Sequence, residues 1–257
     1  MARTSQRARA GAPSLLSDVH DGVAWLALNR PERGNAISLA LAQDLVSAVE
    51  SIELDERVRL VVIEGTGPHF CVGVEGAGNW QRDCDWIAAV ARLTAPVIAV
   101  IEGDAVAEGC ELALACDLRL VSQRARFQLP QLAQGRLPSH GGTQRLPRLV
   151  GRMRAMDLLL SGRSLDAAEA EAFGLTTRVF PAKTFARDVR RFVGELAAKG
   201  PIALRYGKEA VAAGLDLTLD QGIRLEQDLY VLLQTTADRA EGIRAFLEKR
   251  RPKFSGS

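Results

Sequence analysis

The first part of the chain alternates between strand-like and helix-like patterns of apolar residues. Residues 14–19 and 23–28 have the length and composition of two short strands, and the turn-favouring pair Asp21-Gly22 joins them, which predicts a β-hairpin. Residues 39–52 instead repeat apolar side chains every three or four positions, at Leu41, Leu45, Val49 and Ile52. This spacing predicts an amphipathic helix after the hairpin.

Two short, continuously apolar runs follow, at 60–63 and 97–101, and a third predicted strand lies at 118–121. Runs of this length are typical of strands buried on both faces of a sheet. A Gly-rich stretch and a helical segment at about 81–92 separate the first two, and the segment 103–117, rich in Ala, Leu and Cys, predicts a short buried helix before the third. The repeated order strand, strand, helix favours an α/β spiral of stacked repeats over a doubly wound sheet.

Helical spacing dominates from Thr184 onward, with breaks at Gly200-Pro201 and Gly214. The last two predicted helices, about 217–235 and 237–249, each carry an apolar stripe. Helices left over after a core closes pack on that core or on a partner subunit, so we expect the chain to oligomerise through this region. The predicted organisation is a disordered tail at 1–13, a spiral core at 14–198 and a helical C-terminal region at 199–257.

Composition and charge exclude several classes of function. The 257 residues carry a net charge of +2, and they lack the basic face that nucleic acid would need. No apolar run approaches the roughly 18 residues of a membrane span, and the Arg-rich first residues lack the apolar face of a transit peptide. The four cysteines form no CxxC pair and the three histidines are scattered, which predicts reduced thiols in a cytoplasmic protein without a metal. The strings EGTG and GVEGAG lack the GxGxxG spacing of a dinucleotide site, so no cofactor is expected.

Five separated segments resemble, in the same order, the enoyl-CoA hydratase/isomerase (crotonase) superfamily. They are NRPERGNAI at 29–37, VVIEGTGPHFCVGVE at 61–75, APVIAVIEGDAVAEGCELALACDLRL at 95–120, ARFQLPQLAQGRLPSHGGTQRLPRLVG at 125–151 and EGIRAFLEKRRPKF at 241–254. The resemblance spans about 14–254 and implies a ββα spiral core with a helical trimerisation region, assembled as a homotrimer or as a hexamer of two trimers. It also implies an acyl-CoA thioester substrate, with coenzyme A present only as part of that substrate.

Members of this superfamily stabilise the enolate of a thioester. Negative charge develops on the acyl carbonyl oxygen, and two backbone N–H groups directed at it form an oxyanion hole. By resemblance, the donors are the amides of Val74, in the string VGVE, and of Glu108, at the start of the helix that carries CELALAC. A helix N-terminus supplies unpaired amides and a partial positive charge. The family usually has Gly at position 108, and the alternative is that the Glu108 side chain is merely solvated and favoured by the helix dipole.

Glu111 matches one of the two glutamates that hydratases use as general acid and base. It lies in an apolar run, so partial burial is expected to raise its pKa towards the range useful for proton transfer. The alternative is a glutamate that only satisfies amides at the start of its own helix. The second glutamate of a hydratase is replaced by Gln131, after Pro130, and an amide cannot exchange a proton at neutral pH.

Ser139 and His140 stand in PSHGG, where the family has PGAGG. His140 could supply the proton transfer that Gln131 cannot, unless it is an ordinary polar residue of a loop. The resemblance assigns substrate binding to a set of five residues: Arg33, Ala36, Val72, Gly73 and Ser139. Arg33 suits a phosphate of coenzyme A.

Four residues have alternative structural roles. Gly73 and Gly103 suit tight backbone turns rather than chemistry. Trp80 and Trp86 lie in the segment that shapes the acyl pocket in this family, or they pack in the core.

Three functions remain open at this point. The first is an enoyl-CoA hydratase/isomerase reaction with Glu111 as acid/base, in which isomerisation needs only one carboxylate. The second is another reaction of the superfamily, such as decarboxylation, hydrolysis or C–C cleavage of a specialised acyl-CoA. The third is non-catalytic acyl-CoA binding, which the departures at Glu108 and Gln131 motivate.

Overall fold

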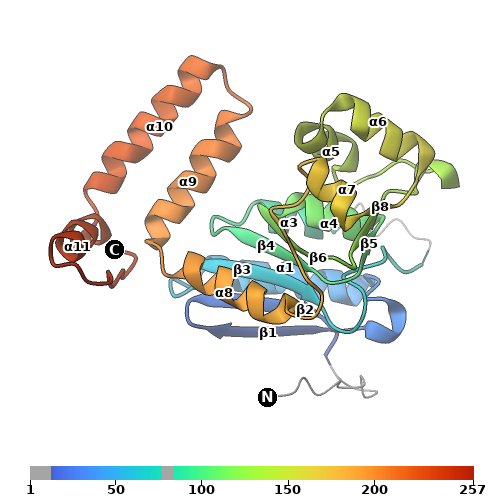
Figure 1. The fold of residues 1–257 in the computed structure, drawn as a ribbon, viewed down its shortest axis with the longest axis horizontal. Coiled ribbons are helices and arrows are strands. Elements are labelled where there is room, and N and C mark those ends of the chain that lie inside the picture. Colours follow the sequence, from blue (N-terminus) through green and yellow to red (C-terminus); the bar gives the residue numbers. More distant parts are fainter. Residues whose placement is uncertain (1–12, 77–83) are drawn as a thin grey trace.

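The structure is a computed structural model that describes residues 13–76 and 84–257 (Figure 1). The tail predicted at 1–13 lies outside the described residues except for Pro13. Trp80 and the first residues of the helix predicted at about 81–92 also lie outside them.

A six-stranded sheet forms the centre of the molecule, in the order β1-β2-β3-β4-β6-β9. β1 (Leu15–His20) pairs antiparallel with β2 (Val23–Leu28), as the predicted hairpin requires. The remaining strands pair in parallel: β3 (Leu60–Gly65), β4 (Val97–Ile101), β6 (Leu118–Ser122) and β9 (Arg178–Phe180). All five strands predicted from the sequence are present.

A second, smaller sheet has the order β5-β7-β8 and was not predicted. Its strands are β5 (Asp104–Val106), β7 (Arg126–Gln128) and β8 (Leu165–Asp166). Isolated parallel bridges, Cys71 with Ala105 and Val74 with Ile37, bring the segment 71–74 alongside β5. Successive turns of the chain therefore give one segment to each sheet before a helix follows, which is the expected ββα spiral.

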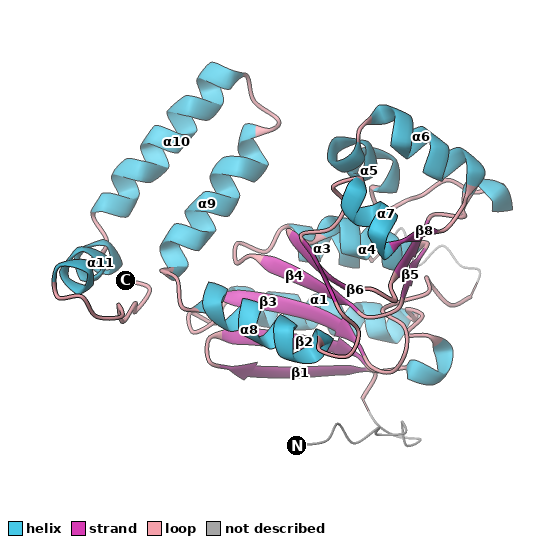
Figure 2. Ribbon diagram, viewed as in Figure 1, coloured by secondary structure: helices cyan, strands magenta, loops and turns pink. Residues whose placement is uncertain are grey.

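Helices cover both faces of the six-stranded sheet (Figure 2). On one face, the main core packs against α1 (Leu39–Glu53), α3 (Trp86–Ala91), α4 (Glu108–Ala115) and α5 (Gly142–Val150). On the other face, α8 (Phe185–Ala197) covers Val62, Val100 and Leu120. Alternate residues of each central strand thus enter different clusters, as strands buried on both sides require.

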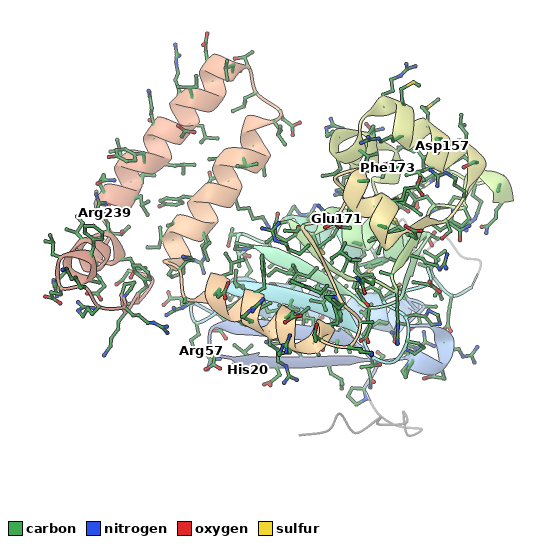
Figure 3. The ribbon with its side chains drawn as sticks, in the orientation of Figure 1. His20, Arg57, Asp157, Glu171, Phe173 and Arg239 are labelled. Atoms are coloured by element: carbon green, nitrogen blue, oxygen red, sulfur yellow. The ribbon has the colours of Figure 1, made fainter. Side chains whose placement is uncertain are left out.

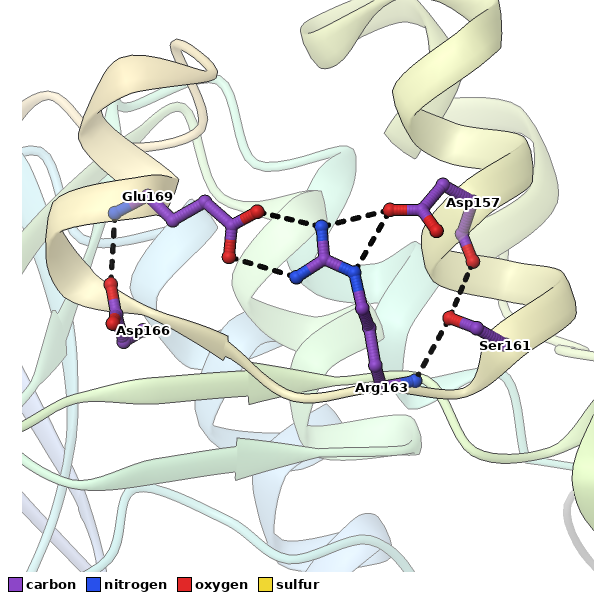
Figure 4. Close-up of polar contacts among 5 residues, drawn as sticks. All are labelled: Asp157, Ser161, Arg163, Asp166 and Glu169. Atoms are coloured by element: carbon purple, nitrogen blue, oxygen red, sulfur yellow. Dashed lines mark hydrogen bonds and ion pairs between the residues drawn. The ribbon is translucent and has the colours of Figure 1, made fainter.

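An arginine links the two helices on either side of β8 (Figure 4). Arg163 follows α6 (Arg152–Ser161), and its guanidinium binds both carboxylate oxygens of Glu169 in α7 (Ala167–Ala172), at 2.6 and 2.8 Å. The same group binds Asp157 of α6 at 2.9 Å. Gln128 of β7 donates to the carbonyl of Gly162 at 2.7 Å, so this unit is tied to the small sheet that borders α4 and α5.

The C-terminal region consists of helices only. Pro201 begins α9 (Pro201–Gly214), and Thr218 and Thr236 cap α10 (Leu219–Gln234) and α11 (Ala237–Leu247). In Figure 1, α9 and α10 run side by side and project from the core. Figure 3 shows many of their side chains standing free of the rest of the chain.

Candidate active site

The first turn of α4 lies against the segment 71–74. Val106 donates to the carbonyl of Cys71 at 2.9 Å, and the amides of Phe70 and Cys71 point to the carbonyl of Asp104 at 3.0 and 3.1 Å. A Cβ on Gly109 would lie 2.1 Å from the Cys71 carbonyl oxygen, so only glycine allows this approach. The helix start and the VGVE segment therefore adjoin.

The two amides predicted as oxyanion donors lie on these adjoining segments. Ile37 donates to the Gly73 carbonyl and accepts from the Glu75 amide, both at 2.8 Å, so the N–H of Val74 between them points away from Ile37. Glu108 is the first residue of α4, where an N–H has no partner within its helix. Neither amide donates to a backbone carbonyl of residues 13–76 or 84–257.

The residue before this helix has a strained backbone that the sequence did not reveal. Ala107 has φ 50° and ψ −120°, a conformation that glycine adopts easily and alanine does not. The ψ of Ala107 sets the orientation of the peptide that carries the Glu108 N–H. Strain of this kind is held in place only by the surrounding structure, here the bond from the Ala107 amide to the Gln128 carbonyl at 2.9 Å.

Glu111 is fully buried on α4, and two amides outside its own helix hold its carboxylate. Oε1 accepts from the backbone N–H of His140 and of Gly142, both at 2.8 Å. Burial raises the pKa of Glu111, and these hydrogen bonds and the nearby His140 only partly oppose that increase. The raised pKa agrees with the expectation from the sequence. The alternative that Glu111 satisfies amides of its own helix is wrong.

Gln131 lies next to Glu111 although 20 residues separate them. Its Nε2 donates to Glu111 Oε2 at 3.3 Å, and its side chain is buried. Its Oε1 has no hydrogen-bond partner within the described part of the chain. The structure thus brings the two positions of the expected acid/base pair together, one as a carboxylate and one as an amide.

His140 and Ser139 precede α5 and differ in exposure. Ser139 is exposed, whereas the His140 imidazole is only 4% exposed and lies 5.7 Å from the ring of Trp86. Nδ1 of His140 lies 3.8 Å from Asp85 Oδ1, and Nε2 has no partner among the described residues. His140 is therefore not an ordinary exposed loop residue, and Trp86, fully buried, takes the core role.

The Glu108 side chain is buried, so the alternative of a solvated residue is wrong. It is 3% exposed and pairs with Arg136, at 3.5 Å between Oε1 and Nη1. Nothing in the sequence connects these positions, because the pair forms only when the loop after η2 (Leu132–Gln134) folds over the start of α4.

The remaining predicted binding residues lie on the loop 30–37 and on VGVE. Arg33 and Val72 are exposed, and Ala36 is buried. Gly73 has φ +113°, and a Cβ on Gly103 would lie 1.9 Å from the Pro68 carbonyl oxygen, so both glycines have the predicted backbone role.

Sequence reasoning missed Arg30, which ties the loop 30–37 to VGVE. Its guanidinium donates to the Ala36 carbonyl at 2.8 Å and to Glu75 Oε2 at 2.7 Å. Glu75, the carboxylate that follows Val74, was the sequence feature that could have pointed to an arginine partner.

Other features lie away from these residues. A cavity of about 920 Å³ opens beside α8, on the other face of the large sheet, lined by residues that include His20, Arg59 and Arg190. Among residues 13–76 and 84–257, no three His, Cys, Asp or Glu side chains are grouped as metal ligands would be. No helix in the same part of the chain has the length and apolarity to cross a membrane.

Comparisons with known proteins identify the family. A sequence model described as enoyl-CoA hydratase/isomerase matches residues 18–257. The 2,3-dehydroadipyl-CoA hydratase of Escherichia coli is 38% identical over 245 residues, 91% of this chain and 95% of that protein. The crystal structure of an enoyl-CoA hydratase from Bacillus anthracis superposes with a TM-score of 0.91 at 35% identity, covering 95% of this chain and 100% of that one. An enoyl-CoA hydratase from Mycobacterium smegmatis gives a TM-score of 0.87 at 32% identity, covering 95% and 99%. The chain is therefore an enzyme of the enoyl-CoA hydratase/isomerase family, with the crotonase fold.

Proposed function

We propose that this protein catalyses an enoyl-CoA hydratase/isomerase-type reaction in which Glu111 moves the proton and the amides of Val74 and Glu108 stabilise the enolate. The observation that carries the proposal is the Glu111 carboxylate, fully buried on the helix whose first N–H donates to no backbone carbonyl of the described residues. A carboxyl group with a raised pKa can both accept and return a proton near neutral pH.

The charge of the intermediate explains the arrangement. When a proton leaves C2 of an acyl-CoA, or when water adds at C3 of a 2-enoyl-CoA, the electron pair moves onto the thioester oxygen. Two fixed N–H donors at a helix N-terminus stabilise that charge without reorganisation. The reaction ends when the electron pair returns from oxygen and a proton is delivered to carbon.

The amide at Gln131 favours a mechanism with one carboxyl group. In isomerisation of a 3-enoyl-CoA, Glu111 takes a proton from C2 and returns it to C4, so the double bond moves and no second acid is needed. In hydration, Glu111 takes the proton of the attacking water and delivers it to C2. Gln131 orients Glu111 through its 3.3 Å hydrogen bond in either case.

Coenzyme A would bind along the loop 30–37. Arg33 is exposed and suits a phosphate, and Arg30 fixes the Ala36 carbonyl beside it. No further cofactor is proposed, because proton transfer to and from an enolate needs none.

The experiment is a panel of 2-enoyl- and 3-enoyl-CoA thioesters, including 2,3-dehydroadipyl-CoA, analysed by mass and ultraviolet absorbance. In deuterium oxide, saturated acyl-CoA thioesters should exchange a C2 proton when an enolate forms. We expect turnover or exchange with the wild type and its loss in Glu111→Gln. A wild type that neither converts nor exchanges any thioester would defeat the proposal.

A second candidate is another reaction of the same superfamily on a specialised acyl-CoA. It is favoured by Gln131 and by the pairing of the buried Glu108 with the half-exposed Arg136, which make the site unlike a two-glutamate hydratase. Malonyl-type and aromatic acyl-CoAs distinguish this candidate, because decarboxylation or hydrolysis changes the mass of the thioester. A protein that binds thioesters but leaves all of them unchanged would be a non-catalytic binder.

We further propose a homotrimer, or a hexamer of two trimers, formed through the C-terminal helices. Large apolar side chains are exposed there, among them Val211, Leu215, Leu219, Tyr230 and Phe246. Patches of this kind mark interfaces between subunits. Light scattering after size-exclusion chromatography tests the assembly.

A cytoplasmic location agrees with four free cysteines, three of them buried.

A further inference from the structure

Glu108 places a second carboxylate beside the amides proposed to hold the enolate. Its side chain is 3% exposed, and a Cβ on Gly73 would lie 3.0 Å from its Oε2. The carboxylate thus lies next to the VGVE segment as well as at the start of α4. Negative charge there opposes the negative charge that develops on a substrate oxygen.

Among the residues that the structure describes, the cation paired with the Glu108 carboxylate is Arg136. On its own helix, Glu111 lies one turn further and is acidic. Just before the VGVE segment, burial raises the pKa of the Cys71 thiol to about 12, so that group is neutral. His140 lies beyond Glu111, to which its backbone is bonded. From the loop after η2, the Arg136 guanidinium lies 3.5 Å from Glu108 Oε1.

The backbone of this loop fixes Arg136 in place. Gly135 has φ +69° and closes a turn in which the Arg136 amide donates to the Gln131 carbonyl at 2.8 Å. Nη2 of Arg136 also donates to Gln134 Oε1 at 2.7 Å. The same turn therefore places Gln131 against Glu111 and Arg136 against Glu108.

We propose that Arg136 is a positioning residue that neutralises and orients the Glu108 carboxylate, so that the oxyanion hole keeps its favourable field. The inference rests on the proposed function. A buried carboxylate that loses its partner is strongly unfavourable, whereas removal of both partners is tolerated. The Glu108 carboxylate is thus compatible with an oxyanion hole only while the Arg136 guanidinium neutralises its charge.

A double-mutant cycle on purified full-length protein tests this, with the best thioester of the panel as substrate. Arg136→Leu should lower kcat by about 10- to 100-fold and change KM by less than about three-fold, because the unpaired charge opposes the transition state more than substrate binding. Glu108→Gln/Arg136→Leu should regain most of this loss, since no charge is left to balance. Arg136→Lys should keep most of the activity. Arg148→Leu, an exposed arginine on α5, is the matched control and should leave kcat unchanged.

Each outcome decides the inference. Recovery in the double variant excludes simple misfolding of Arg136→Leu, and thermal unfolding of every variant checks this directly. An active wild type whose kcat survives Arg136→Leu overturns the inference and leaves the proposed function standing. Failure of Glu108→Gln to restore the Arg136→Leu protein also overturns it. A wild type that is inactive on the whole panel overturns both.

Discussion

Nε2 of Gln131 donates a hydrogen bond to Oε2 of Glu111 at 3.3 Å inside the buried site. The amide therefore contacts the carboxylate that we propose moves the proton, at the position where a hydratase has its second acid. It orients Glu111 but has no proton to give. Its Oε1 has no hydrogen-bond partner among the residues that the structure describes.

Gln131→Glu should increase hydration of a 2-enoyl-CoA by at least about 10-fold, because it restores a general acid. Two carboxyl groups at this separation cannot both ionise easily, so the pair should share a proton near neutral pH. The midpoint of the acid limb of the pH–rate profile should rise in this variant. Gln144→Glu, exposed on α5, is the control. An unchanged hydration rate in a folded Gln131→Glu protein would show that this position takes no part in proton transfer.

Glu111→Gln should lower kcat by about 10²- to 10⁴-fold, the usual loss when an acid/base group is removed. The glutamine oxygen can still accept the His140 and Gly142 amides, so the affinity for a CoA thioester should change little. Isothermal titration and steady-state kinetics separate the two effects. Glu50→Gln, exposed on α1, controls for loss of a carboxylate. Comparable activity in Glu111→Gln and Glu50→Gln would remove Glu111 from the mechanism.

The same substitution should stabilise the fold at neutral pH. Burial raises the pKa of Glu111 above its ordinary value of 4.5, so the folded protein binds this proton more tightly than the unfolded chain does. Stability from the protonated form is present at low pH and is lost as the pH rises through the raised pKa. Urea unfolding should therefore show a gap in favour of Glu111→Gln that widens as the pH rises from about 4 to 7. A gap that narrows over this range would contradict the assigned direction.

Ala107→Gly should raise the free energy of unfolding by about 1 kcal/mol, because it relieves a backbone conformation with positive φ. This net gain in the free energy of unfolding is the strain relieved in the folded protein minus the entropic cost of ordering glycine, which is more flexible in the unfolded chain. Ala105→Gly, in β5 and without a positive φ, should instead lower stability. Urea or thermal unfolding measures both. If both variants lose stability equally, residue 107 is not strained.

Five strands of the large sheet could be predicted, because each holds five or six residues with an apolar pattern, whereas β9 has only three residues and was missed. The small sheet could not, because β5, β7 and β8 contain only two or three residues each and show no period. Its pairing is set by close approaches such as that of Gly109 to Cys71, which depend on the folded backbone. The helix that begins at Leu39 was predicted from the spacing of its apolar residues, and the start at Pro201 from a Gly-Pro break.

The site was only partly predictable for a related reason. Residue types and a family pattern pointed to Val74, Glu108, Glu111 and Gln131, which the fold brings to neighbouring segments. The partner of Glu108 was not predictable, because Arg136 lies 28 residues away on a turn. Nor was the conformation of Ala107, since alanine rarely adopts it.

The most direct test of the proposed oxyanion hole is a crystal structure of the Glu111→Gln protein with a bound enoyl-CoA. We predict that the thioester oxygen lies about 2.7–3.1 Å from the backbone nitrogens of both Val74 and Glu108, with C2 facing residue 111. A thioester oxygen that contacts neither amide, or a Glu108 N–H bonded to another group of the protein, would contradict the account.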